Sequence, residues 1–401
     1  MKRHLIDFIN CCRNEFRILL HDSGLVLFVT FLPLAYPVIY SLIYNPEVVR
    51  DVKVVVVDHD RTAASRDLTR KMDAAQGCRI IGYAPELSEA RRAMDSRDCY
   101  GIMEIPQGYA RKIGRGEVAG VTLYCEMSLL LRYKSLLETA TDVMQLVGAE
   151  LQTQALDEIP MAASYGSAEL MPINHVAMGN IESGFASFIL PAVLILILHQ
   201  CIVLALGMRG GAKRESPYFT GYNSADGSRS VMVGMLATMT VYFIVLLPSL
   251  LFLVHYVSLM FGFPMAGDIW EIVAFLLPLT LGAMCVGLCL QAIVWERESV
   301  FVLWVVTSVV LLFLSGITWP RYAMHGFWRL LSDICPSTWG VEGYVKMCAN
   351  GSSLAQVGHS YAMLWILAGA WFVVAYCLQR WVVRPSQVRS ALPPGSVDSG
   401  M

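Results

Sequence analysis

Long apolar runs dominate the second half of the chain and constrain what it can fold into. Each run is close to the roughly 20 residues that a helix needs to cross a hydrocarbon core of about 30 Å. A similar run near the N-terminus contains two prolines, which membrane-spanning helices tolerate. The runs predict six membrane-spanning helices, over Gly24–Tyr44, Phe185–Leu206, Val231–Val254, Ile269–Val294, Val300–Ile317 and Tyr361–Leu378.

The composition also indicates a membrane protein. Hydrophobic residues make up 56% of the 401 residues and charged residues 15%, and a soluble fold with this balance would expose large apolar patches. The net charge of −2 provides no basic field, so we expect no nucleic-acid partner. The 11 cysteines form no Cys-x-x-Cys pair, which argues against a zinc site and a dense disulfide framework.

The rest of the chain divides into segments of different character. Residues 1–23 carry apolar side chains at helical spacing, which predicts an amphipathic helix in the membrane interface; the alternative is a simple extension of the first span. Residues 45–181 alternate strand and helix patterns, which predicts an α/β domain with a long return helix, inserted between spans 1 and 2. The remaining segments are the five-helix block, residues 182–383, and a tail, residues 384–401.

Within the α/β domain, Asp58, His59 and Asp60 directly follow the first expected strand. Carboxylates and imidazole are the groups that metal and acid–base sites require. Adjacent strand residues point to opposite faces, however, so we favour a turn in which an aspartate caps the following helix. The expected strands are Val52–Val57, Arg79–Tyr83, Tyr100–Ile105 and Val118–Glu126, and the expected helices Ser65–Ala75, Leu87–Arg97, Gln107–Gly114 and Leu129–Ile159.

The distribution of lysine and arginine predicts the orientation. In a six-span topology the basic residues near span ends fall on one side, which places both termini in the cytoplasm and the α/β domain outside it. The predicted fold is therefore an α-helical integral membrane protein with six transmembrane helices and an inserted extracytoplasmic α/β domain. The basic residues concerned are Lys2, Arg3, Arg13, Arg17, Arg209, Lys213, Arg214, Arg229, Arg297, Arg380, Arg384 and Arg389.

The outer loop of residues 320–360 keeps aromatic and apolar residues without a segment long enough to span. This pattern predicts re-entrant or interfacial short helices, or equally an amphipathic cap over the bundle. Its cysteines, Cys335 and Cys348, are compatible with a disulfide and with free thiols.

Two segments resemble a known family. LSGITWPRYAMHGFWRLLSDICPSTWGVEGY, Leu314 to Tyr344, is similar to the region in which permease subunits of bacterial type-2 ABC exporters leave their fifth span and form short external helices. The matching positions, candidates for an external gate loop, are Ser315, Gly316, Pro320, Pro336 and Trp339. IMEIPQGYARKIGRGEVAGV resembles the external domain of these permeases. Its matching positions are Ile105, Pro106, Gly108, Tyr109 and Gly116.

The resemblance covers essentially the whole chain and implies export across the bacterial inner membrane. The scarcity of charged residues in the spans suggests a hydrophobic or amphipathic substrate. No phosphate-binding loop GxxxxGK[ST] occurs in the sequence, so ATP is expected on a separate subunit. This chain itself is expected to bind no cofactor and to catalyse no reaction. Other implied partners are a second permease copy or paralogue, a periplasmic adaptor and the lipid membrane.

Two cytoplasmic segments, residues 209–229 and 296–298, are candidates for docking the ATPase, together with the N-terminal helix. The alternative is that both are solvated loops. The first segment lacks the Gly-Thr pair that is common in the family. The candidate docking residues are Arg209, Lys213, Arg214, Glu215, Glu296 and Arg297.

Two rival functions come from other classes. An ion-coupled secondary transporter would need ionisable residues deep in its spans, and His199 is the one clear mid-span candidate. For this lone histidine we favour hydrogen-bonded packing over a proton relay. A membrane-anchored extracytoplasmic binding protein would not need five further spans.

Overall fold

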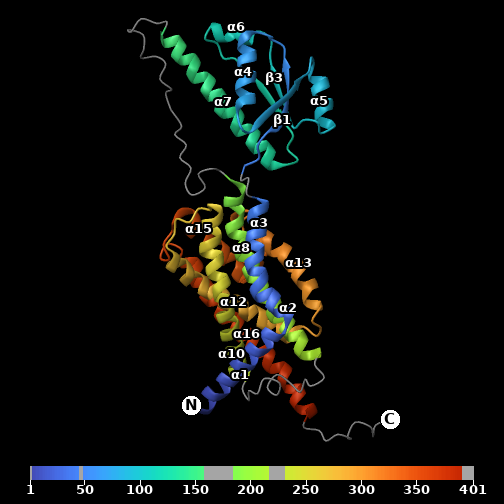
Figure 1. Ribbon diagram of the computed structural model, residues 1–401, viewed down its shortest axis with the longest axis vertical. Coiled ribbons are helices and arrows are strands. Elements are labelled where there is room, and N and C mark those ends of the chain that lie inside the picture. Colours follow the sequence, from blue (N-terminus) through green and yellow to red (C-terminus); the bar gives the residue numbers. More distant parts are fainter. Residues whose placement is uncertain (1, 45–47, 158–183, 216–230, 391–401) are drawn as a thin grey trace, which may run out of the picture. The chain divides into compact units, whose positions relative to one another are not determined.

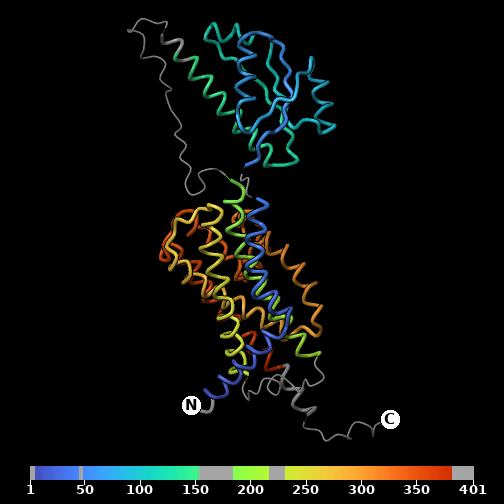
Figure 2. Tube along the Cα trace, in the orientation of Figure 1, coloured from blue at the N-terminus to red at the C-terminus, as the bar shows by residue number. Residues whose placement is uncertain are grey.

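The computed structural model describes residues 2–44, 48–157, 184–215 and 231–390 (Figures 1 and 2). The chain forms two compact units. One is Pro46–Val176, the α/β unit, and the other, the helical unit, combines Met1–Asn45 with Ala177–Met401. The end of the expected return helix after residue 157, most of the expected loop 209–229 and the last part of the expected tail lie outside the described residues.

A four-stranded mixed sheet forms the centre of the α/β unit, in the order β2-β1-β3-β4. β1 (Val52–Asp58) is parallel to both β2 (Cys78–Tyr83) and β3 (Gly101–Ile105), and β4 (Thr122–Cys125) is antiparallel to β3. All four strands coincide with expected ones within a few residues. β2 lies next to β1 on one side of the sheet, and the chain then returns past β1 to form β3 on the other side of β1.

Right-handed crossovers in opposite directions place their helices on opposite faces of a sheet, and this is the arrangement in Figure 1. α4 (Ala63–Ala74) and α7 (Leu130–Asp157) cover one face, and α5 (Leu87–Asp95) packs on the other. Side chains of β1 alternate between the two cores: Val54 and Val56 contact the α4–α7 side, whereas Val55 and Val57 contact the α5 side.

Five helical segments of the described residues are long and apolar enough to cross a membrane. The first is built from α2 (Ser23–Val26), a π-helical turn and α3 (Leu32–Ile43), and the third from α10 (Val231–Leu251), a second π-helical turn and α11 (Val257–Phe261). The other three are α8 (Phe185–Glu215), α12 (Ile269–Ile293) and α16 (Gly358–Ser390).

The expected fifth span is shorter than the others. α13 (Ser299–Leu314) has 16 residues, or about 24 Å of helix against a hydrocarbon core of about 30 Å. The helix ends before the expected Ile317 because Gly316 adopts a left-handed φ of +88°. The structure therefore gives five full-length candidates and one short apolar helix, and the count of six spans remains a prediction.

α1 (Lys2–His21) is a helix separate from the first span. Asp22 breaks the helix with an extended backbone, and its carboxylate accepts hydrogen bonds from Gly24 N at 3.0 Å and Leu25 N at 3.2 Å, which caps α2. The alternative of a simple extension of the span is therefore wrong. The buried face of α1 contains Glu15 and Leu19 and packs against α10.

The apolar stripe predicted for α1 does not coincide with the face of α1 that packs against α10. Of its members, Leu5, Ile9 and Phe16 are exposed. A helix with this division presents its apolar residues away from the bundle, as an interfacial helix would.

The loop of residues 320–360 contains a 3₁₀ turn (Arg321–Ala323), α14 (Gly326–Ile334) and α15 (Pro336–Asn350). α14 exposes nearly all its large apolar residues, as expected for an interfacial helix or cap. α15 is instead largely buried against α8, α12 and α16, which differs from both an interfacial helix and a surface cap. A Cβ added at Gly340 or Gly343 would overlap α12 side chains, which shows how closely α15 approaches that helix. Cys335 and Cys348 are free thiols.

Candidate functional site

The residues expected to dock an ATPase lie together at one end of the helical unit. They come from the last turns of α8 and from the turn between α12 and α13, and two acidic residues from the α1–α2 region join them. We call this set the Glu15 cluster. Its members are Glu15, Asp22, Arg209, Lys213, Arg214, Glu215, Glu296 and Arg297.

Glu15 occupies the buried centre of the cluster. The guanidinium of Arg209 donates to both of its carboxylate oxygens at 3.1 Å, and Lys213 Nζ lies 3.4 Å from Oε1. All three residues are at most 5% exposed. Burial alone would raise the pKa of Glu15, but the charges of Lys213 and Arg209 outweigh it and lower the pKa to about 2. Arg209 and Lys213 thus join α8 to α1 and present no exposed charge.

Arg214 connects the end of α8 to the end of α12. Its guanidinium donates to the carbonyl oxygens of Ile293, at 3.3 Å, and of Ala292, and it lies 4.7 Å from the ring centre of Trp295. The last carbonyls of a helix have no partner within the helix. Arg214 therefore stabilises the C-terminus of α12 by capping it.

Arg297 connects three elements at the rim of the cluster. Its backbone N–H donates to Glu215 Oε1 at 2.7 Å, and its Nη2 donates at 2.5 Å to Asp22 Oδ1, the same oxygen that caps α2. Glu215 and Glu296 are exposed. The rim is thus the part of the cluster that another chain can reach.

Sequence reasoning missed the two acidic members, Glu15 and Asp22. Glu15 lies four residues after Cys11 and four before Leu19, on the buried face of α1. The sequence signal that could have identified Glu15 was an acidic residue four residues away from an apolar residue on either side. The capping role of Asp22, directly before the first span, could also be read from its position.

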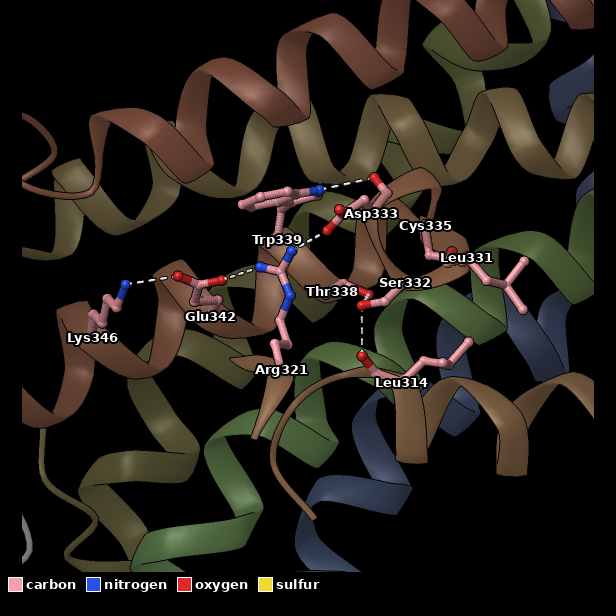
Figure 3. A network of polar contacts seen from close by, with 10 residues as sticks. All are labelled: Leu314, Arg321, Leu331, Ser332, Asp333, Cys335, Thr338, Trp339, Glu342 and Lys346. Atoms are coloured by element: carbon pink, nitrogen blue, oxygen red, sulfur yellow. Dashed lines mark hydrogen bonds and ion pairs between the residues drawn. The ribbon is translucent and has the colours of Figure 1, made fainter. Parts of the chain in front are cut away.

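Arg321 organises the gate-loop candidates near the opposite end of α8 (Figure 3). Its guanidinium donates to Glu342 Oε2 at 2.5 Å and to Asp333, and it lies 4.1 Å from the ring centre of Trp339. The indole N–H of Trp339 donates to the backbone oxygen of Asp333 at 3.0 Å. We call these four residues the Arg321 clamp. It joins the 3₁₀ turn, α14 and α15.

A cavity of about 530 Å³ adjoins the Arg321 clamp. Four of the five gate-loop candidates line it: Ser315, Gly316, Pro320 and Trp339. The fifth, Pro336, begins α15 and instead packs near Gly282 of α12. The prediction from sequence therefore identified a group of residues that the fold brings together, with one exception.

α8 reaches from this cavity to the Glu15 cluster. Phe188 and Ala192 near its start line the cavity, and Arg209 to Glu215 at its end belong to the cluster. Its 31 residues correspond to roughly 46 Å of helix. α8 is also the most buried of the candidate spans. Because it is tightly packed, a movement of α8 at the Glu15 cluster would also move its other end at the cavity.

The Asp58–His59–Asp60 turn in the α/β unit has a structural role. Asp60 accepts hydrogen bonds from Gly108 N at 2.8 Å and Ala110 N at 3.0 Å, and these bonds, led by Ala110, lower the pKa of its carboxylate. It therefore caps α6 (Tyr109–Gly114), whereas Thr62 caps the following helix α4. The predicted turn is confirmed, since Asp58 Oδ1 accepts hydrogen bonds from Asp60 N at 3.0 Å and Arg61 N at 2.9 Å, but the prediction that an aspartate caps the following helix is wrong. No cluster of three or more potential metal ligands occurs among the described residues.

A comparison with protein families decides the assignment. The family model described as "ABC-2 family transporter protein" matches residues 24–377. The chain belongs to this ABC-2 transporter family. It is thus a multi-pass membrane component of an ABC transporter, in a family that works with an ATP-binding partner. No curated protein sequence matches the chain significantly.

In this ABC-2 family member, the glycine pair before Lys213 serves packing. Gly210 and Gly211 lie within α8, and a Cβ added at Gly211 would lie 2.5 Å from the backbone nitrogen of Arg297. A Cβ at Gly210 would lie 2.6 Å from the backbone oxygen of Gln291. Because these two residues have no side chain, the backbone of α8 can contact the backbone of the end of α12 and of the α12–α13 turn directly.

Proposed function

We propose that the chain is the permease subunit of an ATP-binding-cassette exporter that moves a hydrophobic or amphipathic substrate outward across the bacterial inner membrane. ATP is bound and hydrolysed by a separate subunit. The observation that carries the proposal is the single helix α8, whose ends belong to the Glu15 cluster and to the cavity at the Arg321 clamp. Such a helix can couple a motor at one surface to substrate release at the other.

The ATPase docks at the rim of the Glu15 cluster in this mechanism. Glu215, Glu296 and Arg297 provide its polar contacts, because they lie at the surface or near it. The buried pairs of Glu15 with Arg209 and Lys213 hold α1 and α8 together, so that both helices move as one when the ATPase closes. In this mechanism the rim of the Glu15 cluster contacts the ATPase, and the buried centre of the cluster transmits the movement to α1 and α8.

The remaining parts of the proposal follow the family assignment and the charge distribution. Both termini lie in the cytoplasm and the α/β unit in the periplasm, where it receives substrate or meets an adaptor. A second copy or a paralogue completes the translocation pathway. The chain holds no cofactor of its own and catalyses no reaction.

The structure gives no support to the rival secondary transporter. His199 is buried on α8, and within the described residues neither ring nitrogen has a hydrogen-bond partner. The expected hydrogen-bonded packing is therefore wrong, and the ring packs without polar contacts. A proton relay needs a chain of such contacts, which the described surroundings of His199 do not supply.

Affinity purification in mild detergent tests the proposal. We expect an ATP-binding subunit to be recovered with the wild-type chain and to be lost or strongly reduced in the Glu215→Lys/Glu296→Lys variant. Glu117→Lys, an exposed change in the α/β unit, is the matched control and should retain the subunit. Transport that stops on proton uncoupling but continues on ATP depletion would contradict the proposal.

A further inference from the structure

A second cavity, of about 340 Å³, lies between α3, α8 and α13 in the helical unit. Its lining is mostly aliphatic and aromatic. Apart from Cys201, the lining residues that carry polar groups are three tyrosines of the first span, one glutamine of α8, and a tryptophan and a serine of α13. These residues are Tyr36, Tyr40, Tyr44, Gln200, Trp304 and Ser308.

The three tyrosines form one wall of the cavity. They are spaced four residues apart, so they lie above one another on the same side of the helical turn. The rings of Tyr36 and Tyr40 are 6.1 Å apart at 74°. A wall of aromatic rings favours a flat or ring-bearing apolar body in contact with it.

Two hydrogen-bond donors at this cavity lack an acceptor. Within the described residues, Gln200 Nε2 and Trp304 Nε1 are buried atoms with no hydrogen-bond partner, and Gln200 as a whole is 5% exposed. A buried donor left without an acceptor is destabilising. Since an indole N–H can only donate, a ligand that satisfies both groups must contribute hydrogen-bond acceptor atoms, such as carbonyl, ester or ether oxygens.

The charge of the lining restricts the ligand further. No Asp, Glu, Lys or Arg is among the described residues that line the cavity. A charged ligand would therefore lose its hydration without gaining a counter-ion. The uncharged lining therefore favours an uncharged ligand.

We propose that this cavity binds an uncharged amphipathic molecule with a ring-bearing apolar body and a carbonyl, ester or ether oxygen, which accepts hydrogen bonds from Gln200 and Trp304. The proposal rests on the proposed function and narrows its substrate class from hydrophobic or amphipathic to neutral and acceptor-bearing. The tyrosine wall contacts the rings, and the two donors orient the oxygen.

Photolabelling of the purified full-length chain in lipid nanodiscs, without ATP or a partner subunit, tests this site. Radiolabelled benzophenone is the probe, because it has two rings and one carbonyl oxygen and forms covalent bonds on illumination. We expect the label in peptides containing residues 36–44, 189–201 and 304–312. Label spread over the lipid-facing surface of α16 instead would overturn the proposal.

Three competitors on the same two-ring scaffold separate the contributions. Unlabelled benzophenone keeps the acceptor, diphenylmethane lacks it, and aminodiphenylmethane replaces it with a largely protonated amine. We expect benzophenone to compete roughly tenfold better than diphenylmethane, the effect of one or two neutral hydrogen bonds. Equal competition by the ketone and the hydrocarbon, or stronger competition by the amine, would each contradict the proposal.

Variants of Gln200 and Trp304 then test whether these two donors cause the preference for benzophenone over diphenylmethane. Gln200→Leu and Trp304→Phe should each reduce the ketone-to-hydrocarbon ratio several-fold, and comparing ratios cancels differences in lipid partitioning. Trp365→Phe on α16 and Gln145→Leu on α7, both outside the cavity lining, are matched controls that should keep the wild-type ratio. A ratio unchanged in both cavity variants would overturn the inference. Recovery of an ATP-binding subunit is measured separately, so failure of this site and failure of the exporter proposal are distinguishable.

Discussion

Glu15 is the residue on which the contact between α1 and α8 most depends. Its carboxylate is buried and faces two cations, Arg209 and Lys213. Removing one partner of a buried ion cluster is destabilising, at a cost of about 3–5 kcal/mol. We therefore expect Glu15→Ala to lower the free energy of unfolding by about this amount, measured as a large fall in melting temperature in detergent.

Two further variants give this prediction its controls. Glu117→Ala changes an exposed carboxylate of the α/β unit and should leave the melting temperature unchanged. The triple variant Glu15→Leu, Arg209→Met, Lys213→Met removes all three charges and should recover most of the loss, because an apolar replacement of a buried ion cluster is often neutral or stabilising. Wild-type stability of Glu15→Ala would show that the buried cations do not need this carboxylate.

The same residue predicts a dependence on acid. The folded chain lowers the pKa of Glu15 from an ordinary value of 4.5 to about 2, so the charged carboxylate stabilises the fold above pH 4.5. This stabilisation is lost as the pH falls from 4.5 towards 2. The difference in melting temperature between wild type and Glu15→Gln should therefore be constant from pH 7 to 5 and shrink below pH 4.5. A difference that grows in acid would contradict the lowered pKa.

At the residue scale, the sequence revealed which basic groups matter but not what they contact. Arg209 and Lys213 stand out as charges at the end of an apolar run, and that position suggested an exposed contact. Their partner lies 194 residues away from Arg209 along the chain. Only the packing of α1 on the bundle brings this carboxylate to them, and no local pattern contains that information.

At the scale of elements, local patterns predicted most helices and strands but not their depth of burial. The bounds of β1 follow within one residue from a run of β-branched residues. α15 was expected only as a short helix of an outer loop. Its insertion against α12 depends on glycines at two close contacts, Gly340 and Gly343, and the partner helix that makes a glycine necessary is not visible in the sequence.

The junction of α8 with the α12–α13 turn gives the element-scale prediction. Gly211→Ala would place a methyl group 2.5 Å from the backbone nitrogen of Arg297, and backbone cannot rotate out of the way as a side chain can. We expect a loss of about 1–3 kcal/mol in the free energy of unfolding. The displaced turn should also weaken recovery of the ATP-binding subunit in affinity purification.

Gly234→Ala is the matched control for this change. Gly234 also lies within a helix, α10, but nothing described lies within 4 Å of an added Cβ. Removing a helical glycine there should leave stability unchanged or raise it by about 0.5–1 kcal/mol. Equal melting temperatures for Gly211→Ala and wild type would show that the close contact relaxes without cost.

At the scale of the whole molecule, changes in composition near residues 45 and 181 are the basis on which the α/β domain was predicted. The two compact units divide the chain close to these positions. The order of the strands did not follow from the sequence, because parallel strands pair through contacts between distant segments. The predicted orientation in the membrane rests on the positions of basic residues, and in the proposed mechanism it determines which end of α8 meets the ATPase.

Labelling of two introduced cysteines tests this orientation. Val118 is 92% exposed in the α/β unit, and Glu298 is exposed in the turn between α12 and α13. A charged maleimide that does not cross membranes should label Val118→Cys in spheroplasts and Glu298→Cys only after the membrane is disrupted, with the wild-type chain, which has 11 cysteines of its own, as background. The opposite pattern would place the rim of the Glu15 cluster outside the cytoplasm. A cytoplasmic ATPase could not reach the cluster there, and α8 would connect the cavity at the Arg321 clamp to the wrong side for export.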